Sequence, residues 1–442
     1  MDATSLGSAR MPSKRRINAT KEQAKSVRVP KLRFPEFRED GEWTSETLGS
    51  VARLSTEKVG DKPAIPMSIT SGVGLVSQVD KFGRIIAGSS YANYLLLKKD
   101  DFAYNKSATK GYPEGFIALY SGDKLAAVPN SIFTCFRIKG ESPIPQYLNY
   151  LFLRNLHGRW LRKFIEVGAR AHGSLSINDE DLLALPVPVP GGKKSVAEQQ
   201  KIVACLNSVD ALIAAQGRKV DALKDHKIGL MQRLFPREGE TQPRLRFPEF
   251  RKAGEWKAKT LGSVCTSFSG GTPSTSKPEY YGGDIPFIRS AEIACDRTEL
   301  SLSPAGLANS SAKMVTAGDV LVALYGANSG DVALARIAGA INQAILCLRS
   351  QESNAFVFHF LSFRKDWIVA TYLQGGQGNL SGEIVKSIVV RFPALAEQRR
   401  IASCLSSLDD LITDEGKKHA ALQRHKRGLM QQLFPSPEEA GA

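Results

Sequence analysis

The sequence predicts a mixed α+β protein in which two domains of unlike sequence alternate with two long helices. Three observations predict this architecture. Two blocks of sequence each occur twice, in the same order, so one half of the chain duplicates the other. The second of these blocks has helical periodicity throughout. The stretches between the blocks carry short apolar runs separated by Gly-rich turns, which is typical of mixed helix and sheet.

The internal repeat sets the predicted domain boundaries. Lys31–Val51 and Arg244–Val264 are identical at 15 of 21 positions, and Ala197–Pro236 and Ala396–Pro435 are identical at 23 of 40. The intervening stretches, 47–190 and 260–390, resemble each other only faintly. The predicted order is a disordered basic arm at 1–30, a first variable domain at 31–190, a central helical spacer at 191–243, a second variable domain at 244–394, and a C-terminal helical spacer with a tail at 395–442.

The composition indicates a soluble protein with a polyanionic partner. The 442 residues include 59 Lys and Arg against 44 Asp and Glu, a net charge of +15, which favours nucleic acid as the partner. The arm Met1–Lys31 holds eight basic and two acidic residues and therefore contributes +6. Met1–Pro30 contains no apolar signal segment, no stretch is long enough to span a membrane, and the six cysteines are scattered. We therefore expect a cytoplasmic protein with no membrane partner and no disulfide framework.

The repeated 40-residue block predicts a long helix in each half. Its apolar residues fall on alternating steps of four and three, the a/d seam of a coiled coil. At 1.5 Å per residue such a helix spans about 57 Å. We expect the two helices to pair antiparallel, the alternative being that each packs on its own domain. Ser195 and Glu198 have the spacing of a capping box at the start of the first helix. Apolar residues of the seam are the predicted partner-interface positions: Ile202, Leu206, Ile213, Leu223, Ile401, Leu405, Ile412 and Leu422.

Each variable domain shows strand and helix signals in the same order. Helices are predicted at 144–162 and 355–373. Each domain ends on a Gly-x-Leu-Ser sequence followed by a Pro-containing apolar segment. A tryptophan occupies the same position of the repeated opening block in both halves, as Trp43 and Trp256. Because the two halves share it, this residue is predicted to be structural. The strand candidates are 116–120, 131–138, 320–325, 341–348 and 384–390.

Together these features resemble the specificity (S) subunit of type I restriction–modification systems. The resemblance covers about residues 31–435. Its carrying features are the Leu-x-Phe-Pro-Glu-Phe opening of each half, the Ser269–Ser274 block, the Asn342-Gln343-Ala344 segment, the Leu-Ser element, and the helices ending Gly-Leu-Met-Gln-x-Leu-Phe. The first variable domain lacks the Gly-Gly-Thr-Pro-Ser block of the second.

The resemblance implies a non-catalytic subunit with two target-recognition domains, each binding one half of a split, asymmetric site in double-stranded DNA. It also implies that the helical regions dock two methyltransferase subunits, and through them two restriction/translocase subunits. No cofactor is expected in this chain, because S-adenosylmethionine, ATP and Mg²⁺ would bind to the partner subunits. The assembled complex would be a DNA methyltransferase and ATP-dependent endonuclease.

The candidate DNA contacts are polar side chains in Gly-bearing loops. Arg, Lys, Asn, Gln, Ser and Thr are the residues that hydrogen-bond to base edges and phosphates. The same residues also satisfy the backbone of ordinary turns, which remains the alternative for each. The candidates are Lys106, Lys110, Arg170 and His172 in the first domain and Thr272, Ser274, Arg289, Asn328, Gln374, Gln377 and Asn379 in the second.

The sequence contains no catalytic motif that we can identify. It has no P-loop, no Pro-Asp nuclease dipeptide, no amino-methyltransferase signature and no metal-binding spacing of histidines. Three alternatives stay open at this stage. The chain is an enzyme with an unfamiliar motif, a coiled-coil adaptor that binds no DNA, or the recognition subunit of a related system with a fused nuclease–methylase partner.

Overall fold

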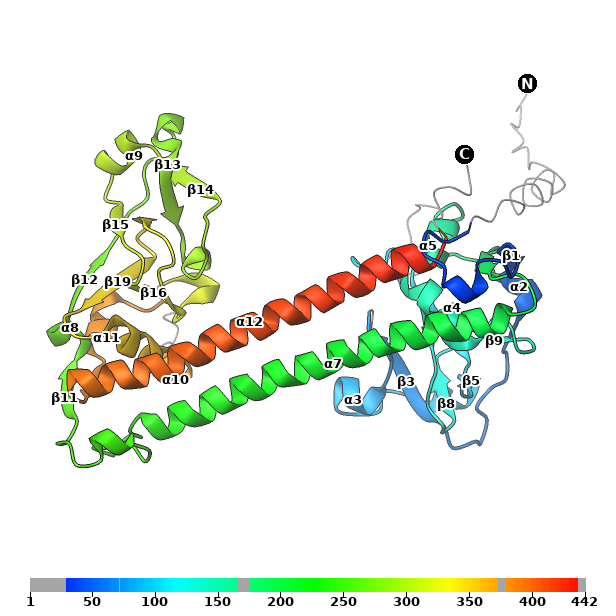
Figure 1. Ribbon diagram of the computed structural model, residues 1–442, viewed down its shortest axis with the longest axis horizontal. Coiled ribbons are helices and arrows are strands. Elements are labelled where there is room, and N and C mark those ends of the chain that lie inside the picture. The colour runs from blue at the N-terminus through cyan, green and yellow to red at the C-terminus, as the bar shows by residue number, and fades with distance from the viewer. Residues whose placement is uncertain (1–28, 71, 166–174, 373–378, 436–442) are drawn as a thin grey trace, which may run out of the picture. The chain divides into compact units, whose positions relative to one another are not determined.

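A computed structural model describes residues 29–70, 72–165, 175–372 and 379–435 as a mixed α+β protein, which confirms the predicted fold class (Figure 1). Contacts divide the chain into two compact units. Unit 1 comprises Met1–Ala214 together with Ala420–Ala442, and unit 2 comprises Ala215–His419. Each unit therefore contains one variable domain and parts of both long helices. The predicted disordered arm at 1–30 lies almost wholly outside the described residues.

Unit 1 contains three sheets and a set of short helices. The strand orders are β2-β9-β6-β7, β4-β3-β8-β5 and β1-β10. Among the described residues of unit 1, only β3 and β8 pair in parallel, and the other pairs are antiparallel. The strands are β1 Thr44–Thr47, β2 Ala52–Leu54, β3 Ile65–Thr70, β4 Gly74–Ser77, β5 Leu95–Leu97, β6 Phe102–Asn105, β7 Phe116–Leu119, β8 Ala126–Val128, β9 Phe133–Ile138 and β10 Pro186–Val189. The helices before the repeated block are α2 Leu48–Val51, α3 Gln78–Phe82, α4 Pro145–Leu153, α5 Leu156–Leu161 and α6 Asp179–Leu183.

Unit 2 has the same sheet topology, strand for strand. Its orders are β12-β19-β16-β17, β14-β13-β18-β15 and β11-β20, again with one parallel pair, β13 with β18. The strands are β11 Lys257–Thr260, β12 Cys265–Ser269, β13 Tyr281–Ile288, β14 Leu300–Leu302, β15 Lys313–Val315, β16 Val320–Ala323, β17 Val332–Leu334, β18 Gly339–Ile341, β19 Ile345–Ser350 and β20 Val389–Phe392. Its helices are α8 Leu261–Val264, α9 Pro304–Ala308, α10 Asn354–Tyr372 and α11 Gly382–Ser387. The duplication therefore includes the variable domains.

One strand prediction is wrong, a second predicted strand is divided between two strands, and one predicted helix is split in two. The 384–390 stretch is mostly α11, whose start is capped by Ser381: its hydroxyl accepts the Ile384 N–H at 3.1 Å. The strand β20 begins only after that helix. The predicted 341–348 strand is divided between the end of β18 and the start of β19. The predicted helix at 144–162 is split into α4 and α5 at Asn155, which has a left-handed backbone (φ +60°).

The repeated block forms α7 (Ser195–Leu234) and α12 (Leu395–Leu433), and the ends of both helices pack on the domains. In unit 1, Leu206 of α7 and Phe434 at the end of α12 share one core cluster with the sheet residues. In unit 2, Leu405 of α12 and Phe235 at the end of α7 share the corresponding cluster. Each domain core thus takes the start of one helix and the end of the other.

Within each unit the two helices run antiparallel and are joined by polar pairs at equivalent positions of the repeat. Lys426 lies 2.5 Å from Asp210 in unit 1, and Lys227 lies 2.5 Å from Asp409 in unit 2. Such half-buried pairs help to set the register of the two helices. Helix pairing and domain packing, which the sequence presented as alternatives, both occur.

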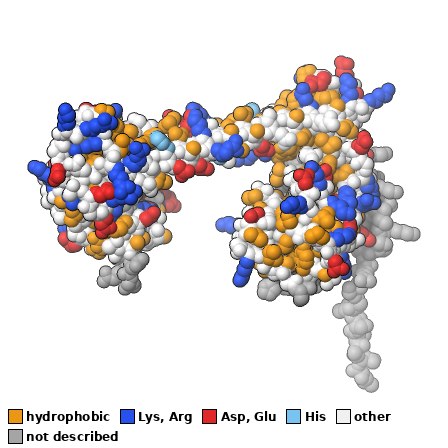
Figure 2. All heavy atoms as spheres, turned by 90° about the horizontal axis from the view of Figure 1, so that it is seen from below, with side chains coloured by type: hydrophobic (Ala, Val, Ile, Leu, Met, Phe, Trp, Pro, Cys, Tyr) orange, Lys and Arg blue, Asp and Glu red, His pale blue; other side chains and the backbone are white. Residues whose placement is uncertain are grey.

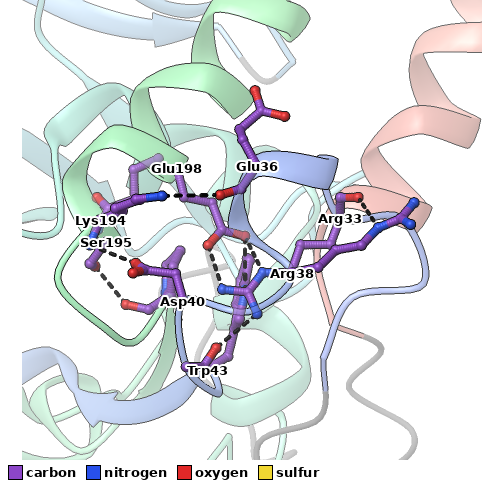
Figure 3. Close-up of polar contacts among 11 residues, drawn as sticks. Arg33, Glu36, Arg38, Asp40, Trp43, Lys194, Ser195 and Glu198 are labelled. Atoms are coloured by element: carbon purple, nitrogen blue, oxygen red, sulfur yellow. Dashed lines mark hydrogen bonds and ion pairs between the residues drawn. The ribbon is translucent and has the colours of Figure 1, made fainter.

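A buried ion pair joins the start of each repeated helix to the repeated block that opens the same half, Lys31–Val51 or Arg244–Val264. The Arg33 guanidinium donates to both carboxylate oxygens of Glu198, at 2.8 and 2.7 Å, and the Trp43 indole donates to the same carboxylate at 3.3 Å (Figure 3). In unit 2, Arg246 makes the same two bonds to Glu397, each 2.7 Å. The predicted capping-box role of Glu198 is therefore wrong, because its carboxylate is used by Arg33 and Trp43.

Candidate nucleic-acid interface

In unit 1 two backbone hydrogen bonds join three chain segments at the end of β6, in the β2-β9-β6-β7 sheet. Lys106, the residue after β6, donates its N–H to Ile132 O at 2.9 Å. The Lys106 carbonyl accepts from the N–H of Leu175, at 2.7 Å. Leu175 belongs to the Gly-x-Leu-Ser element, so Lys106 joins this element to the residue that precedes β9.

Unit 2 contains the same junction at the equivalent positions. Leu324, the residue after β16, donates its N–H to Ala344 O at 2.8 Å and accepts from Leu380 N–H at 2.9 Å. Leu380 is the leucine of the second Gly-x-Leu-Ser element. In each unit the leucine of this shared element is therefore hydrogen-bonded to the first residue of the β6–β7 or β16–β17 turn. We call this arrangement the loop junction.

Around the loop junction of unit 1, the β6–β7 turn presents two basic side chains. Lys106 is half-buried and Lys110 is exposed. In the described part of the chain, neither ammonium group has an ion-pair partner, so both charges can meet a polyanion. Arg170 and His172, the other two candidates in this domain, lie outside the described residues.

Around the loop junction of unit 2, the candidate side chains are neutral. Thr272 donates its hydroxyl to the Gln343 side-chain oxygen at 2.6 Å, which links the Thr-Pro-Ser block to the Asn342-Gln343-Ala344 segment. Ser274 lies 2.8 Å from the Ser276 hydroxyl. Asn328 is half-buried in the β16–β17 turn, and Asn379, which is exposed, directly precedes Leu380. Gln374 and Gln377 lie outside the described residues.

Arg289 differs from the other candidates because its charge is already paired. Its guanidinium lies 2.9 Å from Glu292 and 2.5 Å from Glu299, and these hydrogen bonds raise its pKa. A DNA phosphate would have to compete with both carboxylates. The DNA contact of Arg289 stays a prediction, as do those of the other candidates.

The predicted interface positions on the helices fall into two groups. Four of them are buried inside the chain's own units, where they pack in the domain clusters: Ile202, Leu206, Ile401 and Leu405. The other four are half-buried: Ile213, Leu223, Ile412 and Leu422. The exposed apolar positions of the helices are different residues, among them Leu212 and Leu411, which are equivalent in the repeat.

Two features of unit 1 escaped the sequence analysis. A polar cluster of Glu114, His157 and Arg162 lies behind the β6–β7 turn, and no spacing in the sequence pointed to it. An exposed apolar group follows β3, and Figure 2 shows hydrophobic side chains at the surface of that lobe. A group of this kind is typical of an interaction surface. Its members are Val73, Val79, Phe82, Ile85 and Ile86.

The described residues offer neither a metal centre nor a membrane span. Nowhere in them do three His, Cys, Asp or Glu side chains gather as metal ligands. The helices of that same part lack the length and apolar character that crossing a bilayer requires.

Comparison with known proteins identifies a family domain in the second half of the chain. Residues 253–424 match the model of the type I restriction modification DNA specificity domain. The chain is 28% identical over 329 residues to a protein named as the MjaX type I restriction enzyme specificity subunit of Methanocaldococcus jannaschii, covering 72% of this chain and 74% of that protein. It is 26% identical over 273 residues to the EcoR124I/EcoR124II specificity subunit of Escherichia coli, covering 58% of this chain and 64% of the relative.

Solved structures share the fold. The S subunit of a type I restriction–modification system from M. genitalium superposes with a TM-score of 0.57 at 16% identity, covering 92% of this chain and 100% of that chain. A chain from a study of complex assembly and conformational transition of the type I R-M system gives a TM-score of 0.55 at 18% identity, covering 89% and 97%. Residues 253–424 thus match the type I restriction modification DNA specificity domain, and the predicted resemblance of the chain to type I specificity subunits is confirmed.

Proposed function

We propose that this chain is the DNA-recognition subunit of a type I restriction–modification complex and binds a bipartite, asymmetric site. In this proposal each variable domain contacts one half-site with the loops of its loop junction. The observation that carries the proposal is that the same backbone junction presents different side chains in the two units. A shared backbone with unlike side chains suits two domains that bind unlike sequences.

The charges around the two junctions support different modes of contact. Lysines dominate in unit 1, and they favour phosphates and guanine. Thr, Ser and Asn dominate in unit 2, where 260–390 holds nine basic and ten acidic residues, a net charge of −1. The second domain would therefore depend on hydrogen bonds to base edges more than on bulk charge, whereas the first would contribute more of the salt-dependent affinity.

We infer further that the outer faces of the helices dock two methyltransferase subunits, which would in turn recruit the restriction/translocase subunits. Leu212 is 57% exposed and Leu411 is 41% exposed, so both side chains are accessible to a partner. Their equivalence in the repeat supports two similar docking sites. S-adenosylmethionine, ATP and Mg²⁺ would be bound by the partner subunits, and this chain would be non-catalytic.

The recognition role is tested by mapping N6-methyladenine in a host that expresses this chain together with the methyltransferase subunit. We expect one split motif, which disappears when the gene for this chain is removed. Exchanging residues 260–390 for another recognition domain should change one half of that motif and leave the other half and the spacing as they were. Methylation that persists without the chain, or a swap that alters both halves, would contradict the proposal.

The docking role is tested by co-purification. Leu212→Lys and Leu411→Lys should each lower the number of bound methyltransferase subunits from two to one, and the double variant should bind none. Gln423→Lys places the same charge at an exposed polar position of α12 and serves as the control. Native mass spectrometry counts the subunits, and full occupancy of the double variant would overturn the assignment of these leucines.

A further inference from the structure

The β6–β7 turn of unit 1, residues 106–115, is closed by contacts that come from behind it. The Tyr104 hydroxyl donates to Glu114 O at 2.8 Å, and the His157 Nε2 lies 3.2 Å from Gly115 O. A carbonyl only accepts, so the Nε2 of His157 carries the proton. Gly115 has φ +82°, and a Cβ there would lie 2.4 Å from Asn105 O. Only glycine therefore fits at this end of the turn without moving the backbone.

The side chain of Glu114 is the buried part of this closure. It is 2% exposed, and its Oε1 accepts from Arg162 Nε at 2.6 Å. Burial acts to raise the pKa of Glu114, but the hydrogen bonds from Arg162 and the backbone outweigh it, and the pKa lies below its ordinary value. Its other oxygen has no hydrogen-bond partner among the described residues. A buried carboxylate in this position depends on Arg162 for its compensation.

Unit 2 has an acid–base pair at the end of its equivalent turn, but there the acidic side chain is 39% exposed. Asp331, the last residue before β17, lies 2.5 Å from Lys365 of α10. Gly330, which precedes it, has φ +88°, and a Cβ there would meet Val369 of α10 at 2.7 Å. In each domain, therefore, an acidic residue at the end of the turn pairs with a basic residue from the helical segment after β9 or β19, which is the end of α5 in unit 1 and α10 in unit 2.

We propose that the Glu114–Arg162 pair positions the β6–β7 turn for recognition of the half-site bound by the first domain. This inference rests on the proposed function. The pair joins the turn that carries Lys106 and Lys110 to the end of α5, which packs in the domain core. Without it, the buried Glu114 carboxylate has to move toward water and takes the turn with it. Asp331 and Lys365 join the corresponding segments of the second domain, but their pair is exposed, so its loss should disturb the β16–β17 turn less.

A competing explanation assigns Arg162 directly to DNA. Its side chain is 69% exposed, so its free N–H groups can reach a phosphate. The two explanations predict opposite effects at Glu114. If Arg162 binds phosphate, Glu114→Gln releases it and strengthens binding to every duplex. If the pair positions the turn, Glu114→Gln and Arg162→Gln both weaken discrimination at the first half-site, and the double variant is no worse than either single variant.

The test uses the full chain in complex with its methyltransferase subunit. The probes are a duplex carrying the mapped motif, duplexes with one base pair changed in either half, and an unrelated duplex. The domain exchange at 260–390 identifies the half-site of the first domain as the half that stays unchanged. We expect Glu114→Gln and Arg162→Gln to reduce discrimination in that half by about 10-fold, the scale of one recognised base pair, and to leave the other half unaffected.

Three further variants complete the experiment. Arg162→Lys should restore part of the discrimination, because it keeps the charge near Glu114. Lys365→Gln should reduce discrimination only in the second half-site. Lys99→Gln breaks an exposed pair with Asp123 and should change neither half. Unchanged discrimination in both Glu114→Gln and Arg162→Gln overturns this inference, and so does a uniform loss of affinity in Arg162→Gln with a salt slope reduced by about one. A wild-type complex that does not prefer the mapped motif instead overturns the proposed function.

Discussion

Gln216 and Glu415 occupy the same position of the repeated helix, 199 residues apart, and they contact each other. The Gln216 amide donates to the Glu415 carboxylate at 2.6 Å and to the Glu415 carbonyl at 2.9 Å. Lys219 lies 3.0 Å from the same carboxylate, whose residue is 3% exposed. Had the duplication kept one residue at this position, two glutamines or two glutamates would face each other. The divergence produces a complementary pair.

This contact predicts how the helix pair responds to pH. The hydrogen bond from Gln216, followed by those from Lys418 and Lys219, lowers the pKa of Glu415 from 4.5 to about 2. Because the folded-state pKa is lowered, the stabilisation is present above about pH 4.5 and is lost as the pH falls toward 2. Glu415→Gln should remove this part of the pH dependence, measured as the difference between the two proteins in urea unfolding followed by circular dichroism.

Gln216→Glu should have the opposite effect at neutral pH. It places two carboxylates in contact, so unfolding should need less urea at pH 7, and part of the loss should be recovered on acidification as one carboxylate takes up a proton. Gln423→Glu adds the same charge at an exposed position of α12 and is the matched control. Equal stability of Gln216→Glu and wild type at pH 7 would show that the pair does not hold the helices together.

The buried Arg33–Glu198 pair predicts a large loss of stability when only one partner is removed. Arg33 is 6% exposed and Glu198 is 1% exposed, so Arg33→Leu leaves a buried carboxylate with only the Trp43 indole as a partner. Breaking such a pair typically costs about 3–5 kcal/mol. Thermal and urea unfolding of the full chain measure it. Lys201→Ala, which breaks an exposed pair with Glu36, should cost less than about 1 kcal/mol. Similar losses in both variants would contradict the assignment of the buried pair.

The end of α12 packs in the core of unit 1, which predicts a large loss of stability when its aromatic residue is removed. Phe434 is 1% exposed, packs with its ring centroid 5.4 Å from that of Tyr147, and belongs to the main cluster. Phe434→Ala should therefore destabilise the chain by about 3–5 kcal/mol. Gln431→Ala, one turn earlier at an exposed position, should change stability by less than about 0.5 kcal/mol. A Phe434→Ala chain as stable as wild type would mean that the end of the helix does not pack on the domain.

The buried His157 predicts a second pH dependence, in a higher window. Burial lowers its pKa from 6.5 to about 4, so the unfolded chain binds a proton that the folded chain excludes between these values. Stability should therefore fall as the pH drops from about 6.5 to about 4, by about 3 kcal/mol in total for this group. His157→Gln should show a shallower slope than wild type in this window. His425→Gln, at an exposed position, should keep the wild-type slope; equal slopes in all three proteins would exclude the effect.

Some details of the site lay beyond the sequence for identifiable reasons. The Leu175 and Leu380 elements were visible as a shared pattern, but their partners, Lys106 and Leu324, are reached through backbone groups that every residue possesses. Glu198 has the spacing of a capping residue, but its carboxylate accepts two hydrogen bonds from the guanidinium of Arg33, which lies 165 residues earlier in the chain. Glu114 carries no local pattern, because its partner Arg162 lies at the end of a helix that follows three further strands.

The sequence by itself determined the duplication, the two long helices, the mixed fold class and the resemblance to specificity subunits, because each of these is written in residue identity and periodicity along the chain. Only the tertiary structure decided that the two variable domains share one sheet topology, strand for strand. Strand order is held by backbone hydrogen bonds and by apolar packing that tolerates many side chains, so two domains keep it after their sequences have diverged. The loop junctions and the Glu114–Arg162 pair were likewise decided only by the tertiary structure, because they join segments that lie close together only in the folded chain.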